Sequence, residues 1–389
     1  MKSPYPSIRL LLGLLVALAS LPAASSARNK APVPVLTEQG KALEKEYAGQ
    51  LDAMCKEISA ALPEIDAQKK AAFEAARAEL GELKAPREDD AEAVHRAYHT
   101  AKPLAEAKAL DNARPLIADA KALLASDILD SKLMKVAILR HGTPAGLAEF
   151  AQQSDTHKAL LDKLFADEAL MKRILMSGGA NGGEYGEAMQ VYHAILEASE
   201  LARKPSILQR LALGTALHQP WLDENNKGSV NGIVFTDHSN PDGQVARYLH
   251  YEQAYLAEEL DPQFKDFNAW ECRFITNDPY TNKELTWVRS MLRQFRPDHI
   301  TNPDQKWRYT RVVKSDLPYC STRHDDSLGL PQQQALALGG ICGRRAFFGR
   351  FVARAFGIPS RRSTQTGHAA MNRWTPDGWV VNFGAWWSM

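Results

Sequence analysis

The chain has 389 residues, of which 45% are hydrophobic and 24% are charged, and its formal net charge is +1. This composition is typical of globular proteins and excludes global disorder, collagen-like repeats and a small disulfide-dense scaffold. The near-neutral charge gives no overall signal for nucleic acid or an anionic membrane surface as a partner.

The first 27 residues predict a cleaved secretory signal. Lys2 and Arg9 form a short basic start, residues 10–21 (LLLGLLVALASL) are apolar, and residues 25–27 (SSA) supply small side chains for cleavage. The apolar run is shorter than the ~20 residues that cross a bilayer. We therefore expect a secreted or periplasmic protein with no membrane span in its mature chain.

Three regions with different compositions follow. Residues 28–177 are rich in Ala, Glu, Lys and Leu, with apolar residues at helical spacing, which predicts a helical region of short antiparallel pieces. We expect breaks in this region at Pro115 and at 142–144 (GTP). Residues 178–305 predict a mixed, mainly helical region, and residues 306–389 form a third region of different character.

The third region predicts one apolar helix followed by three strands. The helix covers residues 342–356 and stops at a Gly-Ile-Pro sequence. The strands cover residues 360–365, 368–374 and 379–383. Residues 375–378 (TPDG) predict the hairpin turn between the last two strands.

A cysteine at a helix start and a histidine on a later strand are residues that nucleophilic catalysis can use. Cys342 begins the predicted helix, and the positive end of a helix favours the reactive thiolate. His368 begins the second predicted strand and can take the thiol proton and return it to a leaving amine. A third polar group must then orient the imidazole.

Four short motifs occur here in a fixed order: GGICG (339–343), GIP (357–359), GHA (367–369) and GWV (378–380). In this order they resemble the core of the transglutaminase-like superfamily, over about 50 residues of the chain. The resemblance implies a papain-like domain in which a helix packs on an antiparallel sheet. With the helical N-terminal region, the expected fold class is α+β.

The resemblance implies Cys342 as the nucleophile and His368 as the base, with no metal and no organic cofactor. The family's third residue is usually Asp, and Asn382 occupies that position here. An Asn can orient an imidazole through its carbonyl oxygen. If Gly378 forms a bulge in the hairpin, Asn382 lies opposite Asn372, on the face of His368 but about four residues away along the strand. Either the register is shifted or another group orients the histidine.

The sequence also departs from the family pattern. Arg344 stands where an acidic residue is frequent and is followed by Arg345, and Ala370 stands where an aromatic residue is frequent. These departures predict either a basic, open site that favours an anionic substrate or a degenerate site. The family sheet normally continues beyond the matched strands, so we expect either a fragment or a different closure of the sheet.

Other candidate ligands and cysteines give weaker signals. His95 and His99 have the i, i+4 spacing of two metal ligands, but no third ligand is visible, so we expect a solvent-facing helix and no metal. Cys272 and Cys320 could form a disulfide, although sequence cannot pair them. Cys55 fits the core of an amphipathic helix.

The sequence therefore predicts an exported enzyme that transfers acyl groups at amide bonds through a thioester on Cys342. Water as acceptor makes it a peptidase or amidase, which we favour, and an amine as acceptor makes it a crosslinking enzyme. The expected partner is a peptide or protein amide, with the cell envelope as one source, and not nucleic acid. The alternative is a non-catalytic binding or scaffold protein with a degenerate transglutaminase-like domain.

Overall fold

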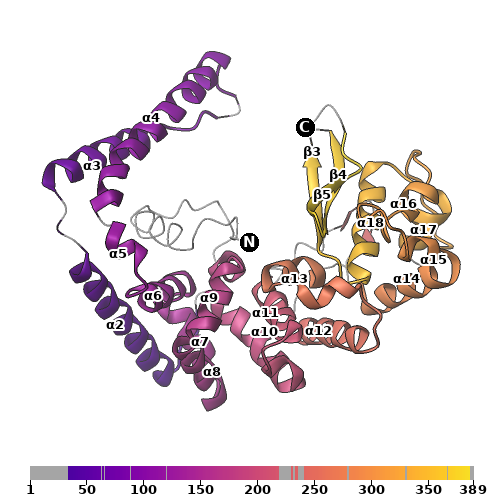
Figure 1. The fold of residues 1–389 in the computed structure, drawn as a ribbon, viewed down its shortest axis with the longest axis horizontal. Coiled ribbons are helices and arrows are strands. Elements are labelled where there is room, and N and C mark those ends of the chain that lie inside the picture. The colour runs from indigo at the N-terminus through magenta and orange to yellow at the C-terminus, as the bar shows by residue number, and fades with distance from the viewer. Residues whose placement is uncertain are drawn as a thin grey trace. The chain divides into compact units, whose positions relative to one another are not determined.

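The computed structural model describes residues 34–62, 64, 66–87, 89–119, 121–218, 229–230, 233–234, 241–277, 280–328, 331–365 and 367–385. The predicted signal at 1–27 lies outside these ranges. The described chain is mostly helical and includes a small three-stranded antiparallel sheet, an α+β composition (Figure 1). It divides into a unit that includes Ala48–Ala137 and a unit formed by Pro34–Tyr47 and Ile138–Met389.

The first unit is built from helices only, in the part of it that the structure describes. Its elements are the part of α2 (Glu38–Ala61) after Tyr47, then α3 (Ala67–Glu82), α4 (Glu92–Asp119), α5 (Lys121–Ala125) and the start of α6 (Asp130–Gly142). Asp66 caps α3, which packs along α4. The small core contains Ile58, Leu129 and Val136.

The predicted break at Pro115 is wrong, because α4 continues through both Pro103 and Pro115. A proline removes one helical hydrogen bond and bends a helix, but it does not always end one. Packing against α3 favours the continued helix, which extends to Asp119.

The second unit contains the remaining helices. They are α7 (Pro144–Ala151), α8 (Asp155–Ala166), α9 (Glu168–Met176), α10 (Tyr185–Ala198), α11 (Ile207–His218), α12 (Pro241–Leu256), α13 (Ala269–Thr276), α14 (Asn282–Phe295), α15 (Pro297–Ile300), α16 (Val312–Ser315), α17 (Pro331–Leu338) and α18 (Cys342–Ala355), with 3-10 turns at Asn181–Gly183, Leu201–Arg203 and Pro262–Asp266. The predicted break at 142–144 is confirmed: Thr143 caps α7, and Pro144 occupies its first turn.

Helix α11 forms the centre of the helical packing in this unit. It contacts α10, α12 and α13, and its residues Ile207, Leu208 and 211–217 are buried. Gly214 permits the close approach to α13, because a Cβ there would lie 2.8 Å from the Ala269 carbonyl oxygen and 2.9 Å from the Arg273 nitrogen. The α13 helix in turn contacts α18 and β3, so the helical packing continues to the sheet.

The sheet has the order β3-β4-β5, with β3 (Ser360–Gln365), β4 (His368–Thr375) and β5 (Gly378–Asn382). These strands and the preceding helix agree with the sequence prediction to within one residue at each end. Helix α18 packs against β3 and β4, as the adjacent ribbons in Figure 1 show. A separate two-stranded pairing joins β1 (Ser229–Val230) to β2 (Ile233–Val234).

The two faces of the three-stranded sheet have different neighbours. Met371 lies on the face toward α18, where a Cβ on Gly349 would come within 2.5 Å of its sulfur. Trp374 and Trp379 are paired across β4 and β5 and share the other face, since side chains alternate along a strand. There Trp379 packs edge-on against aromatic rings of α13, with ring centres 5.6 Å from Trp270.

Candidate active site

Cys342 is the first residue of α18, where the sequence predicts it. The preceding residue, Ile341, is extended and supplies no side-chain cap, so no side chain accepts from the first N–H groups of the helix. The Cys342 thiol is free and half-buried. A half-buried sulfur beside uncapped N–H groups can bind a developing negative charge on itself or on a nearby carbonyl oxygen.

The two glycines before Cys342 fit the chain tightly against the 318–320 segment. Gly339 has a φ of +69°, and a Cβ on it would lie 2.4 Å from the Pro318 carbonyl oxygen. Gly340 donates its N–H to the same carbonyl at 3.1 Å. The Cys320 thiol bonds to the Leu338 carbonyl at 3.1 Å. The glycine pair of the motif therefore fixes the backbone that leads into the helix.

His368 begins β4 and is half-buried, as a residue of the sheet next to the β3–β4 turn. Its Nε2 lies 2.5 Å from the carbonyl oxygen of Phe383. A carbonyl can only accept, so Nε2 carries the hydrogen and Nδ1 is the nitrogen with basic character in the neutral ring. The hydrogen bond to the Phe383 carbonyl therefore fixes the tautomer and the ring orientation of His368.

The expected register of Asn382 is wrong. Thr375 pairs with Gly378 across a two-residue turn, so Asn382 lies opposite Met371 and not opposite Asn372. A shift of one residue moves a side chain to the other face of the sheet. Asn382 therefore shares a face with Met371, whereas His368, three residues earlier in β4, belongs to the opposite face.

The side chain of Asn382 is engaged elsewhere. It is fully buried, and its Nδ2 donates to the Lys306 carbonyl at 2.9 Å. Its Oδ1 is buried with no hydrogen-bond partner among the described residues. The structure thus brings Asn382 to the 306–307 segment and not to His368.

Cys342 and His368 lie at the same end of the α18–β4 pair. Gly349 of α18 faces Met371 of β4, and Arg354 of α18 binds the carbonyl of Ser360, which is paired with Arg373. Residue 354 follows 349 in α18, and residue 373 follows 371 in β4, so the two elements run in the same direction. Cys342 begins α18 and His368 begins β4, which places both residues at the same end of the pair.

The two arginines after Cys342 are used inside the protein, so the expected basic, open site is not built from Arg344. Arg344 is buried and donates to the carbonyls of Arg323, at 2.9 Å, and Gly339, at 3.2 Å. Arg345 donates to the Val313 carbonyl at 3.0 Å and lies 5.5 Å from the centre of the Phe383 ring. Backbone carbonyls satisfy much of this charge.

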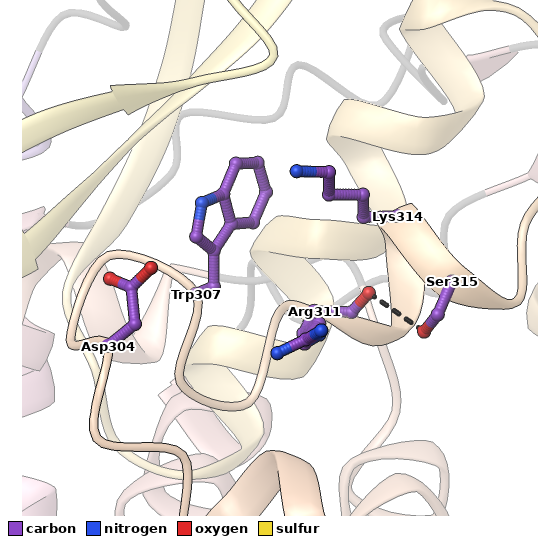
Figure 2. Close-up of a pocket in the computed structure, with 5 residues that line it drawn as sticks. All are labelled: Asp304, Trp307, Arg311, Lys314 and Ser315. Atoms are coloured by element: carbon purple, nitrogen blue, oxygen red, sulfur yellow. Dashed lines mark hydrogen bonds between the residues drawn. The ribbon is translucent and has the colours of Figure 1, made fainter.

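Phe383 joins the histidine to a pocket that sequence reasoning missed. Its backbone has a φ of +61°, and its ring lies 5.1 Å from that of Trp307, centre to centre. The pocket beside Trp307 has a volume of about 450 Å³ and is drawn in Figure 2. Its lining residues are Asp304, Trp307, Arg311, Lys314 and Ser315. No motif in the sequence marks this group, because it is assembled from one loop and α16.

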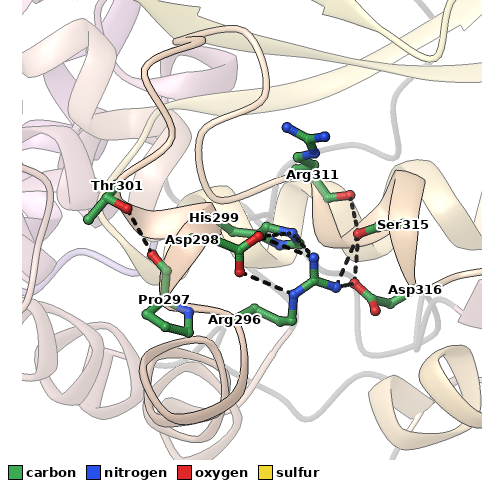
Figure 3. Close-up of polar contacts among 8 residues, drawn as sticks. All are labelled: Arg296, Pro297, Asp298, His299, Thr301, Arg311, Ser315 and Asp316. Carbon is green, nitrogen blue, oxygen red and sulfur yellow. Dashed lines mark hydrogen bonds and ion pairs between the residues drawn. The ribbon is translucent and has the colours of Figure 1, made fainter.

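Polar contacts of Arg296 hold the segment that carries the pocket (Figure 3). Arg296 donates to Asp298 at 3.2 Å and forms an ion pair with Asp316, at the other end of the segment. His299 is buried beside it, with Nε2 2.5 Å from the guanidinium, and burial followed by the Arg296 charge lowers the pKa of His299. The ion pair joins the two ends of the 296–316 segment, which carries the residues that line the pocket.

Comparison with family models, with curated proteins and with solved structures finds no match for this chain. Within the described ranges, no cluster of three or more His, Cys, Asp or Glu side chains is arranged to hold a metal ion. Across the same residues, no helix combines the length and the apolar character that a bilayer span needs. Cys272 and Cys320 are not joined by a disulfide.

Proposed function

We propose that this protein is an exported, cysteine-dependent enzyme that transfers acyl groups at amide bonds. The observation that carries the proposal is Cys342 as a half-buried free thiol at the uncapped start of α18, at the same end of the packed pair as His368. The transglutaminase-like order of motifs around these two residues supports the same chemistry.

In the proposed reaction, His368 takes the Cys342 proton through Nδ1, and the sulfur attacks the amide carbonyl carbon. The oxyanion that develops is stabilised by the N–H groups of the first turn of α18. The C–N bond breaks as the protonated His368 returns its proton to the leaving amine, which leaves a thioester on Cys342. Water then hydrolyses the thioester, with His368 as base, and releases a carboxylic acid. We favour water over an amine as the acceptor.

We assign the orientation of His368 to the Phe383 carbonyl, which accepts from Nε2. Asn382, the residue that the family pattern supplies, could take this role only if β5 changed its pairing with β4. Secretion or export to a periplasm and an amide substrate from peptides, proteins or the cell envelope complete the proposal, and they rest on residues 1–27 and on the motif resemblance.

A non-catalytic binding or scaffold function is the second candidate, and one observation favours it. Alternation along β4 places His368 on the face opposite Met371, the residue that packs against α18. If the imidazole cannot reach the Cys342 sulfur, the pair is vestigial, and the pocket beside Trp307 is then a binding site without chemistry.

The test is iodoacetamide alkylation of the native protein at several pH values, followed by peptide mass spectrometry. We expect Cys342 to react rapidly at about pH 6.5, where an ordinary thiol is almost fully protonated. We also expect His368→Ala to slow this reaction roughly tenfold or more, as removal of a general base does. Cys272, which is fully buried, serves as the internal thiol that should not react.

Slow alkylation of Cys342 at every pH below 8, with the same rate in His368→Ala, would favour the binding or scaffold function instead. Asn382→Ala is the matched control at the other position of the family pattern. It should leave the pH profile of Cys342 alkylation unchanged, since Phe383 and not Asn382 holds the imidazole.

A further inference from the structure

We infer that the pocket beside Trp307 is a subsite for a carboxylate, so that the preferred substrate is a peptide with a Glu or Asp side chain next to the reacting amide. This inference rests on the proposed function for the identity of the substrate as a peptide. The binding of a carboxylate in the pocket rests on the pocket alone.

The charged residues that line the pocket favour an anionic ligand. Arg311 and Lys314 both line it, and neither forms an ion pair with another residue in the part of the chain that the structure describes. Most other arginines near the site bind carbonyls or carboxylates, as Arg296, Arg344 and Arg345 do. Both cations are exposed, and with Asp304, the one acid of the lining, they leave a net charge of +1 that attracts an anion.

The geometry of the pocket supplies the second step. The Nζ of Lys314 lies 5.1 Å from the centre of the Trp307 ring, which holds the ammonium group at the pocket wall. In Figure 2 the Lys314 side chain reaches toward the ring, and the Asp304 carboxylate lies on the other side of the ring. The Asp304 Oδ1 also accepts from the Lys306 N–H at 3.0 Å. One carboxylate oxygen of Asp304 is therefore engaged by its own loop, and the two cations outnumber this acid among the lining residues.

Size and position supply the third step. About 450 Å³ falls within the usual range for a small-ligand site, roughly 300–1,000 Å³, and accommodates one amino-acid side chain with its neighbours. The ring of Trp307 contacts Phe383, whose carbonyl binds His368. The pocket is thus linked through Phe383 to the backbone group that binds His368, and this link is the reason to assign it as a specificity-determining subsite.

Binding is tested by calorimetry on the full chain carrying Cys342→Ser, so that no turnover follows binding. The probes are acetyl-glutamate amide and its neutral counterpart, acetyl-glutamine amide. We expect the glutamate probe to bind roughly tenfold more tightly, since a hydrogen bond to a charged group contributes that much. Added salt should weaken the glutamate probe selectively.

The variants Arg311→Gln and Lys314→Gln should each reduce the affinity for the glutamate probe to nearly that of the glutamine probe. Lys306→Gln is the matched control, because Lys306 is an exposed lysine of the same loop that does not line the pocket. Equal affinity for the two probes, or equal losses in all three variants, would overturn the inference. This readout does not depend on Cys342, so it separates a wrong subsite from a wrong reaction.

Discussion

At the scale of single residues, the cysteine thiols of this chain differ in burial according to their position in the fold. Cys272 is fully buried between α13 and α11, and that burial raises the pKa of its thiol, so it stays protonated. Cys342 is half-buried at a helix start with no side-chain cap. The same residue type is thus a core side chain at one position and a candidate nucleophile at the other.

Substitution of Asn382 tests whether this residue has a structural or a catalytic role. Replacing it with Ala removes the donor to the Lys306 carbonyl and leaves a small cavity, since the side chain is fully buried. We expect the free energy of unfolding to fall by about 1–3 kcal/mol, the usual cost of an unpaired buried polar group. Urea unfolding followed by tryptophan fluorescence measures this, because the eight tryptophans of the chain lie between residues 221 and 387, in the second unit. An unchanged midpoint would mean that this contact contributes nothing.

The sequence could predict the position of Asn382 in the motif but not its contacts. The register of β5 depends on whether Gly378 belongs to the turn or to the strand, and a difference of one residue moves Asn382 to the other face. The sequence could not predict the partners of Arg344 either. They are backbone carbonyls of Arg323 and Gly339, and carbonyls leave no trace in side-chain patterns.

At the scale of elements, local signals predicted α18 and the strands after it well. The Gly-Ile-Pro sequence ends the helix and the Pro-Asp sequence forms the turn through the backbone preferences of those residues, which do not depend on tertiary packing. Pro115 misled for the opposite reason. Whether a proline ends a helix depends on what the helix packs against, and α4 packs against α3.

Gly214 tests the close approach of α11 and α13. A Cβ there would lie 2.6 Å from the Cys272 Cβ, and it would also contact backbone atoms that cannot turn aside. We expect Gly214→Ala to lower the free energy of unfolding by about 1–3 kcal/mol through overpacking, although alanine has the better helix propensity. Tryptophan fluorescence during urea unfolding measures the change.

Gly49 provides the matched control on α2, since a Cβ at that position meets nothing within 4 Å. Gly49→Ala should stabilise its unit by about 0.5–1 kcal/mol, the propensity difference by itself. Circular dichroism at 222 nm is the appropriate measurement, because the helical first unit holds no tryptophan. If Gly214→Ala stabilised its unit, as Gly49→Ala is expected to do, steric crowding at Gly214 would be contradicted.

At the scale of the whole second unit, the pocket is the feature that sequence reasoning could not reach. Its lining residues lie between 304 and 315, and its link to His368 passes through Phe383, which is close to Trp307 only in the folded chain. The ion pair of Arg296 with Asp316, and the hydrogen bond that the Tyr309 N–H donates to the His299 carbonyl at 2.8 Å, show that this stretch closes into a loop.

Two half-buried histidines, His218 and His250, give this unit a pH-dependent stability. Burial, reinforced by nearby arginines, lowers the pKa of His218 and of His250 to about 3. The Nε2 of His250 accepts from Arg289 at 3.2 Å, and that of His218 faces the amide of Asn277, so both rings are held neutral. The unfolded chain binds a proton at each ring below about pH 6.5, whereas the folded chain does not until about pH 3. Stability is therefore greatest above pH 6.5 and falls as the pH drops toward 3.

We expect each of these rings to contribute a slope of about 1.4 kcal/mol per pH unit between roughly pH 6 and pH 4. His218→Gln keeps an acceptor for Asn277 and cannot take up a proton. The slope of the unfolding free energy against pH should therefore be smaller in this variant by about 1.4 kcal/mol per pH unit. Urea unfolding at half-unit pH steps measures both slopes, with pH 7.5 as the reference at which neither protein takes up a proton on unfolding at this position. Parallel slopes for the two proteins would show that His218 is charged in the folded state, because only a ring that stays neutral until the chain unfolds couples proton uptake to unfolding.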